Sequence, residues 1–461
     1  MSLRARLRAV ERATRPVPDE LRAALDRRWR ELPDHARTPA QALGRHSAGC
    51  EGTHGVFPRC DLACTPCYHS REANGVRTDG AHTVAEIDAQ MALLRERRGP
   101  GQHAQLIGGE VTLLGPDDHA AALQAMRRHG RKPMSMSHGD FDYDYLEALA
   151  LDSRTGAPRF DHISFAGHFD SMMFGRRGIR RARTEAELNR YRRRFCEMFQ
   201  RLEREHGIAH YLAHNMTVTP RNLDQVAGVI RDCRQMGFRM FSFQPAAFIG
   251  NRNRWKDEYR SFSADDVWAQ VERGAGSRLP YRVFQMGDER CNRTCHGVLV
   301  GERFVPLVDD RVPADHAVRD AFYATFGGMD FQAPLPAPRI ARALARHPIA
   351  IGVAVRWSAR FAVRAGVVPL LRGPRRALTF VMHSFMDARD VRPAWEALQR
   401  GERSDDPRIR ATQQRLQACS YAMAHPETDE LVPACVQHSV LDLQENLRLQ
   451  ELLPLTHARG A

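Results

Sequence analysis

Three cysteines stand close together in the segment RCDLACTPCY, with the spacing C-x3-C-x2-C at Cys60, Cys64 and Cys67. Soft thiolates so close together fit an iron–sulfur cluster or zinc, because a short loop can surround one metal centre from one side. Three protein ligands rather than four leave one coordination position open for a substrate or cofactor. The alternatives are a zinc knuckle that adds His54 or His69 as a fourth ligand, and three cysteines that only pack in a core.

A second motif, Gly108-Gly109-Glu110, follows the next apolar run of the sequence. Two glycines allow a backbone to approach a ligand closely because neither carries a Cβ, and the carboxylate of Glu110 can bind a cation. Gly-Gly-Glu alone is a weak signal. Its position at the end of the strand that follows the cysteine loop makes it informative.

Between residues 52 and 250, short apolar runs alternate with longer helical periods, which indicates βα units around a parallel sheet. Strands are predicted at 53–57, 103–107, 133–137, 162–165, 211–218 and 239–243, and helices at 84–97, 118–129, 185–205 and 223–236. This repetition predicts an α/β fold with an open or closed barrel. The cysteine loop follows the first predicted strand, at the carboxyl end where such barrels place their chemistry, and this position favours a catalytic centre over a zinc knuckle.

With these motifs the sequence resembles the radical S-adenosylmethionine (SAM) enzymes, whose signature is C-x3-C-x2-C followed by Gly-Gly-Glu on the second strand of a partial (β/α)6 TIM-like barrel. The resemblance covers roughly residues 50–250. It implies a [4Fe-4S] cluster on the three cysteines of the loop, with SAM chelating the open iron through its amino and carboxylate groups. Glu110 would hold the SAM amino group by a charge-assisted hydrogen bond, and Gly108 and Gly109 would border the methionine part.

The resemblance also implies a reaction class. An electron from a donor such as ferredoxin or flavodoxin would cleave SAM to a 5′-deoxyadenosyl radical, which abstracts hydrogen from an unactivated carbon. An oxidation or the formation of a carbon–carbon bond would follow. The hard chemistry belongs to the cofactors, while the protein orients them and excludes water.

The sequence departs from this family where adenine and ribose would bind. Many members carry an aromatic residue just before the third cysteine, near the adenine, but here Pro66 stands there and Tyr68 follows the cysteine instead. Ser164 on the fourth strand stands at a position that often contacts the ribose, but the usual following acidic residue is replaced by Ala166. Asn215 on the fifth strand is a further candidate to contact the ribose or the carboxylate.

Four cysteines of the C-terminal half are candidates for a second centre. They are Cys291, Cys295, Cys419 and Cys435. Four thiolates would saturate an auxiliary iron–sulfur cluster, making it structural or electron-relaying; a structural zinc site and a set of reduced, buried thiols are the alternatives. Cys196 and Cys233 lie on apolar helical faces, which predicts core positions, and Cys50 fits either interpretation.

Residues 383–388 and 419–435 resemble the C-terminal module of the archaeal tetraether lipid synthase and its bacterial relatives, and residues 243–246 resemble a segment at the end of their barrel. This resemblance implies a reaction on lipid alkyl chains, which an apolar tunnel must hold. The apolar stretches at 349–371 would line such a tunnel, although ordinary core packing explains them equally well. The expected substrate is a lipid or another hydrophobic chain.

No apolar run reaches the length of a membrane span, since Arg356, Arg360 and Arg364 divide the stretch at 349–371. A helix packed on the barrel with its arginines in water is favoured over a basic amphipathic helix at a membrane surface.

The 461 residues are sufficient for two or three domains. The predicted division is a helical appendage at 1–49, the barrel core at 50–260 and a cysteine-bearing region at 261–461. With 43% hydrophobic and 27% charged residues, the composition excludes a wholly disordered, collagen-like or membrane-spanning chain. The chain start lacks a secretory signal, and ten cysteines are too dilute for a disulfide scaffold. These features predict a cytoplasmic protein, with peripheral membrane contact as a further expectation.

The net charge of +13 favours phosphates, anionic lipid surfaces or nucleic acid as partners. Nearly all of it is arginine, with Lys132 and Lys256 as the only lysines, a bias that a GC-rich genome also produces. Two rival functions remain. One is a radical SAM enzyme that matures peptides, although residues 1–50 show no winged-helix pattern for leader binding. The other is a non-catalytic, metal-bearing protein that binds nucleic acid, which is not the expected partner.

Overall fold

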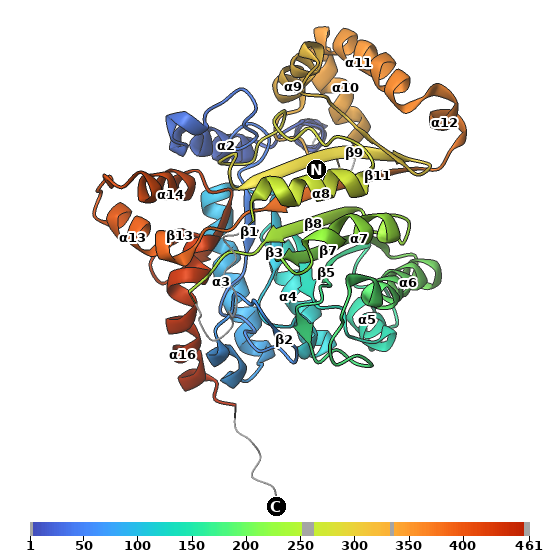
Figure 1. Ribbon diagram of the computed structural model, residues 1–461. Helices are drawn as coiled ribbons and strands as arrows, with labels where there is room; N and C mark the ends of the chain where they lie inside the picture. Colours follow the sequence, from blue (N-terminus) through green and yellow to red (C-terminus); the bar gives the residue numbers. More distant parts are fainter. Residues whose placement is uncertain (1–2, 251–261, 332–335, 456–461) are drawn as a thin grey trace, which may run out of the picture.

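The computed structural model describes residues 3–250, 262–331 and 336–455. An 11-stranded sheet runs through the molecule in the order β10-β9-β11-β8-β7-β5-β4-β3-β1-β12-β13 (Figure 1). Its strands are β1 (Cys50–Gly52), β3 (His103–Leu106), β4 (Lys132–Ser137), β5 (His162–His168), β7 (Ala209–Val218), β8 (Met240–Pro245), β9 (Asn292–Val300), β10 (Arg303–Pro306), β11 (Arg375–His383), β12 (Tyr421–His425) and β13 (Glu430–Pro433). A separate small sheet pairs β2 (Ala63–Cys64) with β6 (Met173–Phe174).

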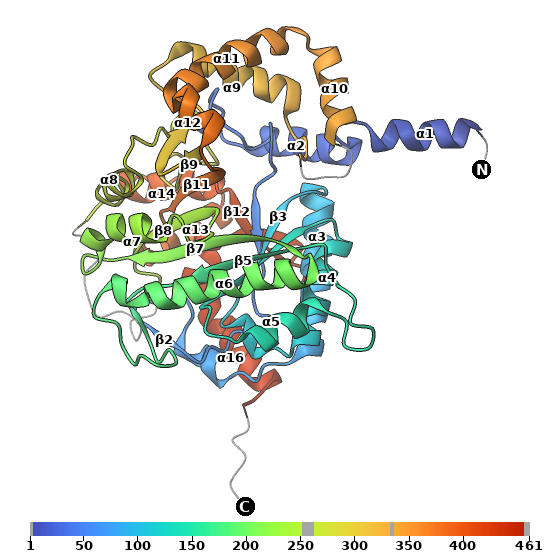
Figure 2. The ribbon, with the colours of Figure 1, turned by 90° about the vertical axis from the view of Figure 1, so that its right-hand side faces the viewer.

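Every neighbouring pair of strands from β12 across to β11 is parallel, and the antiparallel strands β9, β10 and β13 lie only at the two edges. Parallel neighbours need long crossover connections, which helices usually supply. The helices of the core are α3 (Gly80–Arg98), α4 (Pro116–Arg128), α5 (Tyr143–Ala150), α6 (Asn189–His206), α7 (Val226–Cys233) and α8 (Ala264–Ala275). They cover one face of the sheet (Figures 1 and 2). The fold is therefore a partial (β/α) barrel, and the predicted α/β class is confirmed.

The first predicted strand differs from the observed one, because β1 ends before residues 53–57. The N–H of Thr53 still donates to the carbonyl of Gln105 on β3 (3.1 Å). Gly55 then has a φ of 65°, a conformation that glycine adopts without strain, and the chain turns away from the sheet. The other five predicted strands match β3, β4, β5, β7 and β8.

Two strands of the C-terminal half extend this sheet at both ends, which the sequence did not predict. β12 pairs with β1 in the register Cys50↔Tyr421, and β11 pairs with β8 in the register Thr379↔Met240. The predicted boundary between 260 and 261 lies outside the described residues.

The main core lies between the sheet and its helices. Phe165 on β5 packs against Phe199 on α6 with ring centroids 5.0 Å apart, and Phe241 stacks on Phe380 of β11 at 5.9 Å. Side chains alternate between the two faces of a strand. Neighbouring residues such as Ser164 therefore point to the opposite, concave face of the barrel.

The remaining helices lie outside the barrel core: one group lies at the top of both views, a second lies at the left of Figure 1, and the first helix projects away from the molecule in Figure 2. They are α1 (Leu3–Ala13), α2 (Asp19–Glu31), α9 (Pro313–Phe326), α10 (Pro336–Arg346), α11 (Ile349–Ala365), α12 (Val367–Arg372), α13 (Ala388–Gln399), α14 (Pro407–Gln417), α15 (Ala434–Val436) and α16 (Asp442–Leu452). The predicted N-terminal helices are present as α1 and α2. Within the described ranges, no helix has the length and apolarity needed to cross a membrane.

The orientation of α11 differs from the prediction. Phe361 packs in a small core with Val300 of β9 and Val305 of β10, so the helix rests on the antiparallel edge of the sheet. Arg360 and Arg364 do not point into water, because they bind the carboxylate of Asp315 on α9 at 2.9 and 2.6 Å. Asp315 is fully buried, and two guanidinium groups compensate its charge.

Candidate active site

The cysteine loop begins beyond the carboxyl end of β1 and is fixed by a neighbouring loop. Cys64 pairs with Met173 of β6, and the N–H of Thr65 donates to the carbonyl of Met172 (3.1 Å). The N–H of Cys60 donates to the side chain of Asn74 (3.2 Å). All three cysteines of the loop are half-buried and none forms a disulfide. The loop therefore lies at the edge of the barrel where the sequence predicted the chemistry.

Gly108 and Gly109 lie directly against the segment that leads into the cysteine loop. The N–H of Gly109 donates to the carbonyl of Phe57 (2.7 Å), and the N–H of Glu110 donates to that of Arg59 (2.8 Å). A Cβ on Gly108 would lie 2.8 Å from the Phe57 oxygen, and one on Gly109 would overlap the carbonyl oxygen of Arg59. Only glycine permits this approach. The two glycines thus position the cysteine loop, and their contact with SAM stays a prediction.

The carboxylate of Glu110 is buried, with 1% of the residue exposed, and reaches the end of β4. Its Oε1 accepts hydrogen bonds from the hydroxyls of Thr112 (2.6 Å) and Ser137 (2.7 Å). Its Oε2 accepts from the N–H of His138 (2.8 Å). These donors stabilise a buried negative charge. A SAM amino group at Glu110 would share the oxygens with these partners.

His138 is a site residue that the sequence analysis did not assign. The imidazole is buried, and its Nε2 lies 2.7 Å from Asp61 and 3.3 Å from Glu110. Burial lowers the pKa of His138, but the charge of Glu110 and the hydrogen bond to Asp61 outweigh it and raise the pKa above its usual value. Ligand atoms of Cys60, Asp61 and His138 all lie within 4.8 Å of one another. The sequence did hold one signal for this role: His138 comes directly after β4, the strand that pairs with the strand before Gly-Gly-Glu.

The protonation of Cys60 suits metal binding rather than nucleophilic catalysis. Burial raises the pKa of Cys60 to about 12, and the charges of Glu110 and Cys67 act in the same direction. A thiol with such a pKa is unreactive at neutral pH. A metal ion can displace its proton, since metal binding and deprotonation are coupled.

The zinc-knuckle alternative needs a histidine, and the structure gives both candidates other partners. Nδ1 of His54 lies 2.5 Å from Glu445, and Nε2 lies 2.7 Å from the carbonyl of Ala424. His69 binds Asp442 through Nδ1 (2.7 Å). Among the described residues, no three-ligand group within 4.8 Å joins the three loop cysteines or adds His69 to them. The three thiolates are thus not already gathered around one ion, and a polynuclear cluster does not require them to be so close, because it binds each thiolate on a separate iron.

Tyr68 connects the cysteine loop to the Gly-Gly-Glu segment and to His438. Its hydroxyl donates to the carbonyl of Gly108 (3.0 Å), and its ring lies 4.5 Å from the ring of His438. Burial raises the pKa of Tyr68 well above its usual value, and the charge of Cys67 adds to this. The hydroxyl is therefore a neutral donor, and a contact of this residue with SAM stays a prediction.

Ser164 and Asn215 lie on the concave face of neighbouring strands β5 and β7, which pair in the register His168↔Asn215. Ser164 is half-buried and Asn215 is buried. His168 on the same face binds Asp170 at 2.7 Å. The two predicted SAM-contacting residues thus share the concave face, while the ligand that they contact stays a prediction.

The predicted second cysteine group needs one correction. Cys295 lies on β9 and is 2% exposed in the main core, where burial raises its pKa above the usual range. Burial raises the pKa values of Cys50, Cys291 and Cys435, and the charge of Cys419 adds to the rise in all three, so these cysteines lie near Cys419. The sequence could not separate Cys295 from the other cysteines of this group, because residues 292–300 were not predicted as a strand whose alternation carries Cys295 into the core. Cys196 and Cys233 are fully buried in the core, as predicted.

No family model matches the chain, and no curated protein matches it. Among solved structures, it is similar to "Native anSMEcpe with bound AdoMet and Cp18Cys peptide", with 13% identity, a TM-score of 0.33, and coverage of 49% of this chain and 58% of that one. It is also similar to "Native anSMEcpe with bound AdoMet", with 14% identity, a TM-score of 0.32, and coverage of 50% and 62%. The chain thus spans about three fifths of the length of these structures. So distant a similarity does not define the substrate of this chain.

Proposed function

We propose that this chain is a radical SAM enzyme that acts on a lipid or another hydrophobic chain. Cys60, Cys64 and Cys67 would hold a [4Fe-4S] cluster with one iron open to SAM. The observation that carries the proposal is the docking of the Gly-Gly-Glu backbone against the segment that enters the cysteine loop, at the carboxyl edge of a partial (β/α) barrel. This geometry joins the two motifs of the sequence in one site.

When bound, the cluster and SAM supply a radical able to abstract hydrogen from an unactivated carbon. The residues of the chain position the cluster and SAM. Gly108 and Gly109 fix the loop, Glu110 supplies a buried negative charge for the SAM amino group, and Ser164 and Asn215 orient the remainder of SAM from the concave face. The aromatic core behind the sheet makes this frame rigid.

The test is anaerobic reconstitution with iron and sulfide, followed by dithionite and SAM. We expect 5′-deoxyadenosine, measured by chromatography and mass spectrometry, from the wild type and none from Cys64→Ala, because two thiolates cannot hold the cluster. Cys233→Ala is the matched control, since this cysteine is buried in the core, and it should retain the product. Iron-loaded wild type that forms no product would contradict the proposal, and salt-dependent nucleic-acid binding in its place would favour the non-catalytic alternative.

A surface of exposed apolar side chains supports the hydrophobic substrate class. On α11, Ile351, Val355 and Val363 are 48%, 64% and 78% exposed and follow a spacing of four or eight residues, which places them on one face. The adjacent α12 adds Val367, Val368 and Leu371, all at least half exposed. We name these six residues the apolar stripe. Since Arg360 and Arg364 of α11 bind Asp315, the helix presents an apolar side outward, the reverse of an ordinary surface helix.

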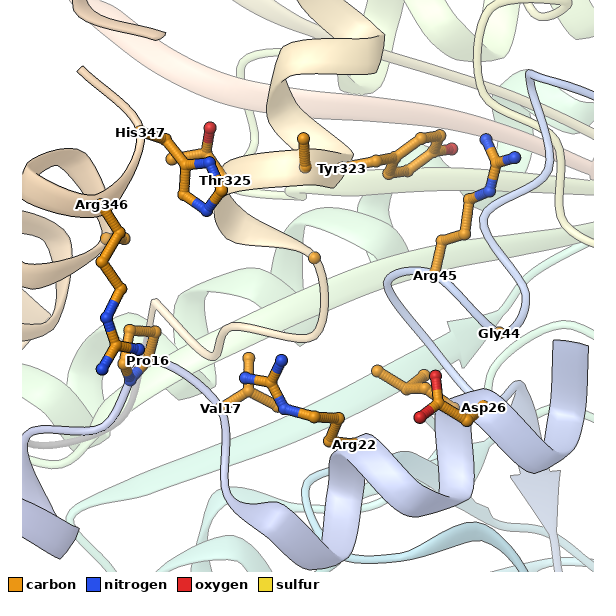
Figure 3. Close-up of a pocket in the computed structure, with 14 residues that line it drawn as sticks. Pro16, Val17, Arg22, Asp26, Gly44, Arg45, Tyr323, Thr325, Arg346 and His347 are labelled. Carbon is orange, nitrogen blue, oxygen red and sulfur yellow. The ribbon is translucent and has the colours of Figure 1, made fainter. Parts of the chain in front are cut away.

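The charge around the apolar stripe indicates an anionic membrane as its partner. Arg356, Arg372 and Arg375 are exposed on the same segment, and the whole chain carries +13. A pocket of about 370 Å³ between α2, α9 and α10 is lined by further basic groups, among them Arg22 and Arg346 (Figure 3). Burying one such valine or leucine in an apolar phase contributes roughly 1.5–3 kcal/mol, and arginines near anionic lipid add to this.

The membrane contact is tested by sedimentation with vesicles of phosphatidylglycerol and phosphatidylcholine, and of phosphatidylcholine alone. We expect binding to the anionic vesicles, weakened about tenfold or more in the double variant Val355→Asp, Val363→Asp because two charges would enter the apolar phase. Leu452→Asp, an exposed position on α16, is the control and should bind as the wild type does.

Equal binding by the double variant and the wild type would overturn the membrane contact. A change of oligomeric state in the double variant, with vesicle binding unchanged, would assign the apolar stripe to a second copy of the chain. Stimulation of 5′-deoxyadenosine formation by peptides but not by lipids would favour the peptide-maturing alternative.

A further inference from the structure

Four cysteines from three separate regions of the chain meet at one place beside β1 and β12. This four-cysteine site consists of Cys50, Cys291, Cys419 and Cys435. Cys50 is the first residue of β1, and its N–H donates to the carbonyl of Ser420 (2.8 Å). Because β1 pairs with β12 in the register Cys50↔Tyr421, Cys50 and Cys419 lie next to each other at the start of two parallel strands.

Cys291 reaches the same place through hydrogen bonds on both sides. Its sulfur accepts from Nε of Arg415 on α14 (3.1 Å), and its carbonyl accepts from the N–H of Ser384 (2.7 Å). The next residue, Asn292, donates to the hydroxyl of Ser420 (3.0 Å). Cys291 is therefore attached to the loop that carries Cys419.

Cys435 is brought in by the hairpin of β12 and β13. Pro433 pairs with Ala422, so the chain leaves β13 beside the start of β12 and enters α15. Burial and the charge of Cys419 raise the pKa of Cys435 to about 12, while a hydrogen bond from the backbone of Met386 acts in the opposite direction. A backbone hydrogen bond from Ala434 likewise lowers the pKa of Cys419.

The surroundings of the four-cysteine site compensate negative charge. Besides Arg415, Arg98 donates to the carbonyl of Cys50 (2.9 Å) and Arg28 to that of Cys419 (2.7 Å). The charges of Arg98 and Arg28 also lower the pKa of Cys419, against the larger effect of burial. A metal centre that binds cysteine sulfurs takes them as thiolates and displaces their protons. Guanidinium groups and amide donors around sulfur then stabilise the charged thiolates.

We propose that the four-cysteine site holds an iron–sulfur cluster with one cysteine thiolate on each iron. Four sulfurs around one zinc ion lie about 3.8 Å apart, from Zn–S bonds of about 2.3 Å. In the described part of the chain, none of these sulfurs belongs to a three-ligand group within 4.8 Å. A cubane spreads its ligands farther, because each binds a separate iron. This cluster is independent of the proposed SAM site and has no open iron.

The test replaces the three cysteines of the loop and measures the iron that the rest of the chain still binds. The triple variant Cys60→Ser, Cys64→Ser, Cys67→Ser is reconstituted anaerobically, and iron, acid-labile sulfide and zinc per chain are measured together with the electron paramagnetic resonance spectrum after reduction. We expect about four irons and four sulfides. Adding Cys419→Ser should lower both below about one per chain, whereas adding Cys295→Ser, in the core, should leave them unchanged.

Three outcomes overturn the proposal. A folded triple variant without iron shows that the site binds no cluster. One zinc without sulfide shows a mononuclear site, and loss of iron on Cys295→Ser shows a different ligand set. If circular dichroism shows that the variant with Cys419→Ser does not fold, Cys435→Ser replaces that change. The iron content of the triple variant alone still shows whether a second cluster is bound. The result does not depend on SAM cleavage, so it separates this site from the proposed function.

Discussion

At the scale of single residues, the absence of a side chain at Gly109 decides where the cysteine loop lies. A Cβ there would overlap the carbonyl oxygens of Pro58 and Arg59, which are backbone atoms and cannot rotate away. The hydrogen bond from Gly109 to Phe57 also depends on this approach. The motif is thus a structural requirement of the loop as well as a candidate ligand contact.

We predict that Gly109→Ala loses most of the iron bound by the loop, because the segment before Cys60 must move. The overpacking should also lower the free energy of unfolding by about 1–3 kcal/mol. Iron content and thermal unfolding, measured in a background that lacks Cys419, report on this loop alone. Gly115→Ala is the matched control, since the nearest atom to its Cβ is 3.7 Å away. A Gly109→Ala variant that keeps its iron would show that the loop tolerates the displacement.

At the scale of elements, α16 is fastened to the turn after β1 by a buried ion pair. His54 donates to Glu445, which also accepts from Gln437 (3.0 Å). Burial lowers the pKa of His54, but the charge of Glu445 together with the hydrogen bonds to Glu445 and to the carbonyl of Ala424 outweighs it, so the folded-state pKa is raised. The pair therefore stabilises the fold fully below the unfolded pKa of about 6.5, and this contribution is lost as the pH rises through the higher folded-state pKa.

The variant Glu445→Gln should lower the free energy of unfolding by about 1.5–3 kcal/mol at pH 6, the usual contribution of a hydrogen bond to a charged group. At pH 9 the difference from the wild type should be smaller, because the charged form of His54 is lost as the pH rises through its folded-state pKa. Thermal unfolding between pH 6 and 9 measures this difference. Glu451→Gln, exposed on the same helix, should show no such trend. A deficit that does not vary with pH would exclude ionisation of His54.

The elements that were predicted correctly are those whose pattern is local. β3, β4, β5, β7 and β8 are short apolar runs between helices, and five of the six predicted strands match. The sequence could not predict β11 and β12 as members of the sheet, because their partners are far away in the chain. The same reason explains the cysteines: Cys60, Cys64 and Cys67 were found by spacing, whereas Cys50 joins its group only through strand pairing.

At the scale of the whole molecule, the two halves of the chain form one sheet. β1 lies between β3 and β12, and β8 lies between β7 and β11. Deleting residues 419–461 should therefore leave β1 as an unpaired edge, remove α16 from the cysteine loop and give a chain that aggregates. Size-exclusion chromatography and limited proteolysis measure this. A monomeric, protease-resistant fragment would show that the barrel folds without β12.

The position of β12 has a consequence for biosynthesis. During translation the cysteine loop leaves the ribosome long before the segment that forms β12 and α16, so its thiols stay without their final neighbours for most of elongation. Pairing across so long a stretch of chain is slow. The proposed metal centre would therefore be completed only after release from the ribosome, and a chaperone that shields the open edge of the nascent chain should raise the yield of folded protein.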